Sequence, residues 1–181
     1  QNLNVALIQF NTGQDKQQNI HHACALVESA AGEGAGFILL PEVFNYRGPL
    51  SGSDLYDKIA EDIPGESLTP LMKIAKKTGV NILAGSVYER AEEKNKVYNT
   101  SVVIDKSGSL ICKYRKINLF HAVIDGKEID EANTYEAGDK PVICEINSIK
   151  IGLSICFDLR FPELYRGYFN KGVNIVAVPS S

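Results

Sequence analysis

The 181-residue chain is long enough to bury one sizeable core, and we expect residues 1–181 to form a single domain. Its 44% hydrophobic content, 23% charged content and net charge of −3 are those of an ordinary globular protein. Basic residues are scattered, and no apolar run approaches the ~20 residues of a membrane span, so we expect neither a nucleic-acid nor a membrane partner. No signal-peptide pattern is visible, and we expect a cytoplasmic protein.

The cysteine pattern does not indicate a metal centre. Cys24, Cys112, Cys144 and Cys156 are far apart and form no C-x-x-C pair, which argues against a zinc site and against a disulfide scaffold. We therefore expect reduced thiols, no metal and no cofactor.

The first part of the chain predicts a βαβ-like unit. Residues 3–10 have the pattern of a buried strand, and apolar residues then recur at helical spacing from about Asp15 until the glycine-rich segment 32–36. Residues 37–40 form a second short apolar run, and Glu42 follows it almost directly. We expect Glu42 to lie at the end of this strand.

A loop-like segment, a helix and a strand are predicted next. Residues 45–65 mix glycines, prolines and aromatic residues, as loops that shape substrate pockets often do, with room for a short helix at 55–61. Residues 66–77 have helical spacing with Pro70 in the first turns, and residues 81–88 have the composition of a third strand.

Two hairpins are predicted in the second half of the chain. Residues 97–105 and 110–114 form one, and residues 141–146 and 149–156 form the other. Helices that alternate with strands and are interrupted by hairpins favour a mixed sheet over a purely parallel one.

Three other segments complete the prediction. Residues 117–140 are polar and show little periodicity, which is typical of a long functional loop. A helix is expected at 162–171 and a last strand at 174–179.

Three chemically useful side chains follow apolar or β-rich runs. They are Glu42, Lys116 and Cys156. Where strands run the same way, such ends gather in one crevice, so a carboxylate, an ammonium and a thiol could meet there. A thiolate attacks a carbonyl or nitrile carbon, a carboxylate takes the proton, and an ammonium stabilises the oxyanion.

Each of the three residues also has a structural interpretation when it is taken singly. Cys156 could be a buried structural cysteine, Glu42 a helix cap or surface ion pair, and Lys116 the solvated end of a hairpin strand. It is their joint placement at run ends that favours catalysis.

Six segments, spread over nearly the whole chain, stand in a characteristic order. They are Val5-Ala-Leu-Ile-Gln-Phe10, Leu39-Leu-Pro-Glu42-Val-Phe44, Ile63-Pro-Gly-Glu66, Tyr98-Asn99-Thr100, Lys113-Tyr-Arg-Lys116-Ile-Asn-Leu-Phe120 and Ile155-Cys156-Phe-Asp-Leu-Arg-Phe-Pro-Glu163. In these segments the chain resembles the carbon–nitrogen hydrolase, or nitrilase-like, superfamily, and within it the Nit-type amidase branch.

The resemblance implies a Glu-Lys-Cys triad made of Glu42, Lys116 and Cys156. It also implies a second glutamate in the loop after the lysine, for which Glu131 is the best match and Glu128 the alternative. The backbone N–H of Phe157 is expected to share the oxyanion with Lys116. Arg115 and Phe120 are candidates for the pocket wall, and Arg160 for either a substrate carboxylate or a structural ion pair.

The fold that the resemblance implies is α/β, a four-layer α-β-β-α sandwich whose helices pack across a homodimer or higher homo-oligomer interface. The reaction that it implies is hydrolysis of a small carboxylate-bearing amide by water, through a cysteine thioester. Family members continue beyond Pro179 with a Trp-bearing segment, so we expect the sequence to be truncated at its C-terminus.

Several alternatives stay open at this point. Relatives within the superfamily hydrolyse nitriles or carbamoyl groups. Cys156 could instead pair with His121, or with His21 and His22, although none of these histidines follows a strand. The chain could also be a truncated interaction module without catalytic activity.

Overall fold

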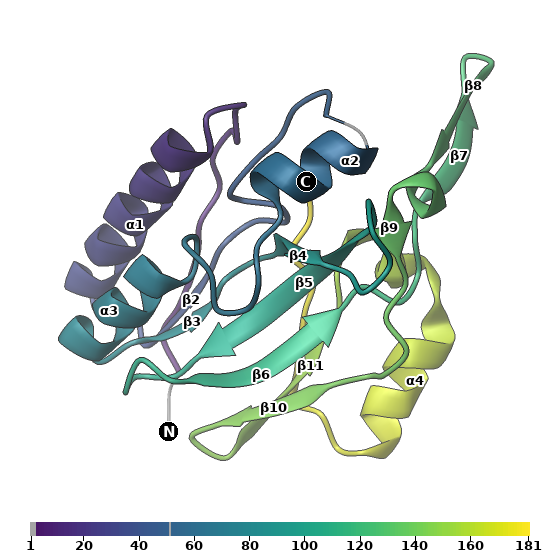
Figure 1. The fold of residues 1–181 in the computed structure, drawn as a ribbon. Coiled ribbons are helices and arrows are strands. Elements are labelled where there is room, and N and C mark those ends of the chain that lie inside the picture. Colours follow the sequence, from purple (N-terminus) through teal and green to yellow (C-terminus); the bar gives the residue numbers. More distant parts are fainter. Residues whose placement is uncertain (1–2, 51) are drawn as a thin grey trace.

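Four layers build the computed structural model, which describes residues 3–50 and 52–181. Helices α1 (Lys16–Gly32) and α3 (Thr69–Thr78) form the first layer, two sheets form the middle, and α4 (Pro162–Asn170) covers the far side (Figure 1). This helix-sheet-sheet-helix order confirms the predicted α/β sandwich. Within the described residues, no helix has both the length and the apolar character that a membrane crossing needs.

The larger sheet is mixed, as the hairpin pattern predicts. Its core order is β1-β2-β3-β5-β4, with β6 and β9 also pairing to β5. Strands β1, β2 and β3 are parallel, whereas β5 runs antiparallel to β3, β4 and β6. The strands described in it are β1 (Val5–Leu7), β2 (Phe37–Leu39), β3 (Asn81–Leu83), β4 (Val87–Arg90), β5 (Val97–Ile104), β6 (Leu110–Arg115) and β9 (Tyr135–Glu136).

The second sheet contains the strand that leads to Cys156. Strands β10 (Ile143–Ile146) and β11 (Ile149–Leu153) form the predicted hairpin, and β12 (Ile175–Ala177) pairs with β11 in parallel. Helix α4 packs on its outer face, where the Tyr168 hydroxyl donates a hydrogen bond to the Leu153 carbonyl. A short 3₁₀ turn, Cys156–Arg160, joins β11 to α4.

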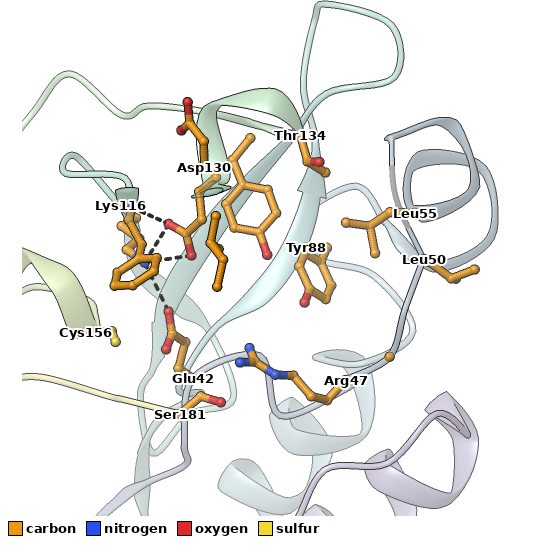
Figure 2. A pocket seen from close by; sticks show the side chains of 15 residues that line it. Glu42, Arg47, Leu50, Leu55, Tyr88, Lys116, Asp130, Thr134, Cys156 and Ser181 are labelled. Atoms are coloured by element: carbon orange, nitrogen blue, oxygen red, sulfur yellow. Dashed lines mark hydrogen bonds and ion pairs between the residues drawn. The ribbon is translucent and has the colours of Figure 1, made fainter. Parts of the chain in front are cut away.

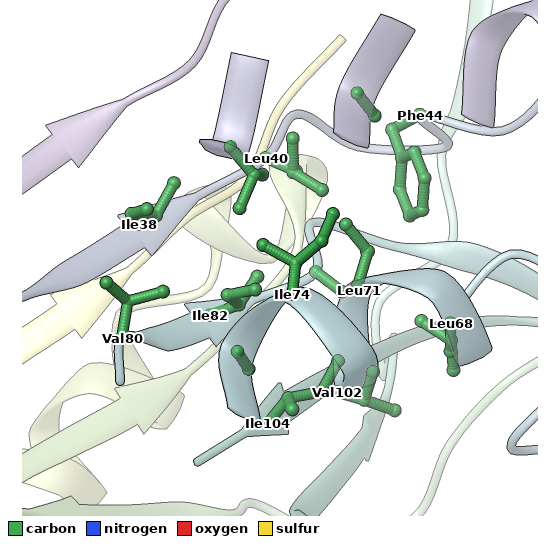
Figure 3. Close-up of a cluster of buried hydrophobic side chains, with 14 of the residues drawn as sticks. Ile38, Leu40, Phe44, Leu68, Leu71, Ile74, Val80, Ile82, Val102 and Ile104 are labelled. Atoms are coloured by element: carbon green, nitrogen blue, oxygen red, sulfur yellow. The ribbon is translucent and has the colours of Figure 1, made fainter. Parts of the chain in front are cut away.

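Two apolar layers hold the sandwich together. The first lies between the helices α1 and α3 and the larger sheet, and Figure 3 shows its aliphatic side chains around Ile74 and Ile82. The second lies between the two sheets, where Phe37 and Leu83 meet Ile151 and Leu153. Burying one such side chain contributes roughly 1.5–3 kcal/mol, so these layers fix the relative positions of the strand ends.

Helix positions follow local signals. Asp15 caps α1 by accepting the Gln18 N–H, and α3 begins at Thr69, three residues later than predicted, with Pro70 in its first turn. The short helix expected at 55–61 is present as α2 (Gly52–Asp54) followed by a π-helical turn at Leu55–Ile59.

The prediction of one strand over residues 81–88 is wrong, because Gly85 divides it into β3 and β4. Gly85 has φ 44°, and a Cβ atom there would lie 1.8 Å from the Pro41 carbonyl oxygen. Only glycine fits this left-handed conformation and this close approach. The apolar run hides the break, since it continues across it.

The prediction of a long irregular loop over residues 117–140 is also wrong. Strands β7 (His121–Ile124) and β8 (Lys127–Asp130) form a hairpin that projects from the body, and a 3₁₀ turn at Glu131–Asn133 leads into β9 (Figure 1). Asp125 and Gly126 both have positive φ, as a tight hairpin turn requires. The hairpin buries little apolar surface and therefore lacks a strand periodicity in the sequence.

Candidate active site

A cavity of about 510 Å³ is lined by residues that follow strands β2, β6 and β11, and Figure 2 shows its side chains. Glu42, Lys116 and Cys156, predicted from three run ends, all line it. The other described lining residues are Arg47, Gly48, Leu50, Leu55, Tyr88, Phe120, Ile129, Asp130, Glu131, Thr134, Tyr135 and Ser181.

Glu42 is held in the cavity by the segment that follows β2. Its side chain is 5% exposed, and Oε1 accepts a 2.9 Å hydrogen bond from Asn99 Nδ2 on β5. The neighbouring Val43 has φ 45°, and its N–H donates to Ser86 Oγ at 2.8 Å. These contacts fix the direction of the carboxylate, which a flexible loop would not do.

Lys116 is the cation at the centre of the site. It follows β6 and is 1% exposed, and its Nζ donates to Glu131 Oε2 at 2.9 Å and to Glu42 Oε1 at 3.4 Å. Burial alone lowers the pKa of Lys116, but the two carboxylates outweigh it and raise the pKa above the ordinary lysine value. The ammonium therefore stays charged at neutral pH.

Glu131 is the glutamate that the structure brings to Lys116. It lies at the base of the β7–β8 hairpin, where its Oε2 also accepts the Phe120 N–H at 2.8 Å. Glu128, the alternative, points away on the exposed hairpin and pairs with His121 at 3.0 Å. Of the two candidates, only Glu131 lines the described cavity.

Cys156 begins the 3₁₀ turn after β11 in a strained backbone conformation. Its φ is 46°, in the left-handed region, and its N–H donates to the Pro179 carbonyl at 3.0 Å. A non-glycine residue in this region is costly, and such strain is common where a nucleophile is presented to a pocket. Burial, followed by the charge of Glu42 and a hydrogen bond to it, raises the pKa of the Cys156 thiol, while Lys116 opposes this.

Asp158 organises the turn that carries Cys156. It is 0% exposed, and its carboxylate accepts hydrogen bonds from the Tyr114 hydroxyl at 2.6 Å, from the Ile155 N–H at 2.9 Å and from Asn118. Four donors to one buried carboxylate fix the turn in place. The backbone N–H of Phe157 has no acceptor among the described residues, so it is free to bind an oxyanion.

The remaining predicted residues separate into two groups. Phe120 lines the cavity and stacks edge-on against Phe157, with ring centroids 5.1 Å apart. Arg160 is exposed and does not line the cavity. Arg115 is also outside it, because it pairs with Glu89 at 2.8 Å and lies over the Tyr98 ring.

Several functional candidates were not singled out from the sequence. Arg47, Tyr88 and Tyr135 line the cavity, and Asn99 orients Glu42. Asn99 lies in one of the six family-like segments, which was a usable signal. Arg47 lies in an irregular loop, where no periodicity indicates the direction of a side chain.

Residues 4–181 match the family model described as carbon–nitrogen hydrolase. The chain belongs to the carbon–nitrogen hydrolase family. Membership confirms the resemblance carried by the six sequence segments, and it covers nearly the whole chain.

Within this carbon–nitrogen hydrolase family, the similar proteins include omega-amidases. The chain is 38% identical over 178 residues to omega-amidase NIT2 of Xenopus tropicalis and 36% identical to that of Homo sapiens, covering 98% of this chain and 63% of each relative. Among solved structures, Saccharomyces cerevisiae Nit3, a member of branch 10 of the nitrilase superfamily, is 30% identical with a TM-score of 0.83, covering 99% of this chain and 64% of that one. The chain thus spans somewhat less than two thirds of these relatives.

Proposed function

We propose that the protein is a cysteine-dependent amidase that hydrolyses small carboxylate-bearing amides with water. The observation that carries the proposal is that Glu42, Lys116 and Cys156 line one cavity. The thiol hydrogen-bonds to the Glu42 carboxylate, and the ammonium lies between two carboxylates of the protein. The chemistry needs a base, an oxyanion stabiliser and a nucleophile, and these three groups supply them.

In the first half of the reaction, Glu42 takes the thiol proton as the Cys156 sulfur bonds to the amide carbon. The carbonyl oxygen becomes an oxyanion, which the Lys116 ammonium and the free Phe157 N–H stabilise. The carbon–nitrogen bond then breaks, and Glu42 returns the proton to the leaving nitrogen. Ammonia departs and a thioester stays on Cys156.

In the second half, Glu42 removes a proton from the water that attacks the thioester carbon. The carbon–sulfur bond breaks, the carboxylic acid leaves, and the thiol regains its proton. One carboxylate thus acts as base and acid in turn. A thiol whose pKa is raised suits this cycle, because it transfers its proton only as the substrate carbon is attacked.

Glu131 acts through Lys116 and is a positioning residue. Two hydrogen bonds from Lys116 Nζ reach its carboxylate oxygens, at 2.9 and 3.2 Å, and a third comes from the Phe120 N–H. The ammonium cannot swing away to pair with Glu42 alone, so it stays directed at the developing oxyanion.

The substrate class is proposed from the relatives, which are named omega-amidases. A monoamide of a dicarboxylic acid fits a cavity of about 510 Å³ without filling it. Assembly into a homodimer or higher homo-oligomer and a cytoplasmic location stay predictions.

Ammonia release from succinamate and glutaramate by the full-length protein tests the proposal. We expect turnover that Cys156→Ala abolishes, and a mass increase on the Cys156 peptide when the reaction is quenched with acid. Nitriles and N-carbamoyl compounds in the same panel test the alternative reactions of the superfamily. Turnover of those compounds alone, or turnover that survives in Cys156→Ala, would overturn the proposal.

A further inference from the structure

Arg47 is a second cation in the cavity, and it comes from a loop instead of a strand end. Its side chain extends from the segment after Glu42 into the pocket, with the guanidinium directed toward the side where Glu42 and Cys156 lie (Figure 2). Among the described residues that line the cavity, Lys116 and Arg47 are the two basic ones.

The two cations differ in whether a carboxylate of the protein already pairs with them. Lys116 is buried between Glu42 and Glu131, so both of its close neighbours are carboxylates of the protein. Arg47 is exposed and forms no ion pair with any acidic residue that the structure describes. Its planar guanidinium therefore keeps its donors available for a ligand, and it matches the two oxygens of a carboxylate.

The backbone around Arg47 is anchored without the help of its side chain. The Arg47 N–H donates to the Gly13 carbonyl at 2.9 Å. The nearby Asn45 is 0% exposed, and its side-chain Nδ2 donates to Ser67 Oγ at 3.1 Å. The backbone carbonyl of Asn45 accepts a hydrogen bond from Asn19 Nδ2 at 3.0 Å. The loop thus has its own hydrogen-bond support, so the guanidinium is not required to hold it.

The cavity lining is acidic, so an anionic substrate needs a cation such as Arg47 to offset electrostatic repulsion. Glu42, Asp130 and Glu131 all line the cavity, against Lys116 and Arg47. Without Arg47, a substrate carboxylate would enter a pocket that contains three carboxylates and one ammonium, and that ammonium is already paired. The like charges in the pocket would repel the substrate. An uncharged amide would experience no comparable repulsion.

Tyr88 lines the same cavity as Arg47 and supplies a second kind of donor. It is 4% exposed, and its ring centroid lies 6.0 Å from that of Tyr135. Burial raises the pKa of both phenols, although the charge of Arg47 offsets part of the effect at Tyr88. Tyr135 donates a hydrogen bond to Tyr88, so the Tyr88 hydroxyl, which stays protonated at neutral pH, is the one that can donate to an anion.

We propose that Arg47 binds the substrate carboxylate, with Tyr88 as a neighbouring donor, and so selects amides that carry an anionic group at the end remote from the amide. The inference rests on the proposed amidase function and adds a specificity determinant to it. The substrate then lies between two fixed points, Arg47 at its carboxylate and Cys156 at its amide carbon. Arg160, for which the sequence left a substrate carboxylate and a structural ion pair as alternatives, does not line the cavity.

Arg47→Gln tests the proposal on two matched substrates, glutaramate and its uncharged analogue butyramide. Loss of a charged hydrogen-bonding pair is expected to lower kcat/KM for glutaramate by roughly 10- to 100-fold, chiefly through KM. Butyramide hydrolysis should change by less than about threefold, because that substrate has no carboxylate to bind. Arg47→Lys should recover part of the glutaramate activity.

Arg160→Gln is the matched control, since it removes an exposed arginine that does not line the cavity. It should leave kcat/KM unchanged for both substrates. An equal loss on both substrates in Arg47→Gln would overturn the proposal, because it would place Arg47 in the reaction machinery. Undiminished glutaramate hydrolysis would overturn it as well.

Calorimetric titration with glutarate separates this proposal from the proposed function, since it requires no turnover. Glutarate should bind the wild-type protein and bind Arg47→Gln roughly 10- to 100-fold more weakly. If the wild type hydrolyses no amide, the proposed function fails, and the titration still decides whether Arg47 binds carboxylates. Equal glutarate affinity in both proteins would overturn the inference even with an active enzyme.

Discussion

The Tyr114 hydroxyl donates a 2.6 Å hydrogen bond to the Asp158 carboxylate, across the interface between the two sheets. Tyr114 belongs to β6, two residues before Lys116, and Asp158 belongs to the turn that carries Cys156. Both side chains are 0% exposed. This buried contact therefore ties the strand that leads to Lys116 to the turn that carries Cys156.

Tyr114→Phe should destabilise the fold and reduce turnover. The variant leaves Asp158 Oδ2 with one donor fewer in a buried site, which costs about 1–3 kcal/mol of unfolding free energy. Urea unfolding followed by circular dichroism measures this loss. Tyr56→Phe is the control, because the Tyr56 hydroxyl has no hydrogen-bond partner among the described residues, and an equal loss there would contradict the prediction.

The two candidate glutamates should respond very differently to substitution. Glu131→Gln removes one of the two charges that hold Lys116, so kcat should fall by roughly 10²-fold with a smaller change in KM. Glu128→Gln should keep nearly full activity, since Glu128 pairs with His121 on the exposed hairpin. Steady-state kinetics of the two variants decides the assignment, and comparable losses in both would refute it.

Glu42→Gln should make the thiol more reactive toward an alkylating agent while it abolishes hydrolysis. Burial, then the Glu42 charge and hydrogen bond, raises the pKa of Cys156, so removing the charge lowers that pKa. The iodoacetamide rate profile, followed on the Cys156 peptide by mass spectrometry, should move to lower pH. The Cys24 thiol, whose pKa burial and Glu28 raise to about 11, is the internal reference and should not move.

His121→Ala should retain amidase activity to within about twofold. His121 is exposed on the β7–β8 hairpin and does not line the cavity, so it cannot serve as the base for Cys156. Rates of ammonia release over pH 6–9 provide the measurement. A large loss of kcat, or loss of one arm of the pH profile, would restore the Cys-His alternative.

The strand ends were the predictable part of the site. Glu42, Lys116 and Cys156 each follow an apolar or β-rich run, and a layered α/β fold brings such ends together. The two sequence hairpins were confirmed for the same reason, since their apolar runs and turn residues are both local signals.

The parts of the structure that the sequence did not predict are segments whose burial leaves no hydrophobic periodicity in the sequence. On the β7–β8 hairpin, Val123 is 66% exposed and Ile129 is 46% exposed, so no apolar face alternates with a polar one. The place of Arg47 depends on hydrogen bonds to Gly13 and around Asn45 that join distant segments. Neither kind of information is contained in a short stretch of sequence.

The proposed reaction also depends on Gly85, a residue that has no reactive group. A Cβ atom at this position would meet the Pro41 carbonyl oxygen at 1.8 Å, and Pro41 directly precedes Glu42. Any side chain there must displace the segment that aims the carboxylate. If every amino acid were tried at position 85 and the library selected for turnover, this position should tolerate as few replacements as the triad itself. Backbone sterics, and not chemistry, would exclude the other residues.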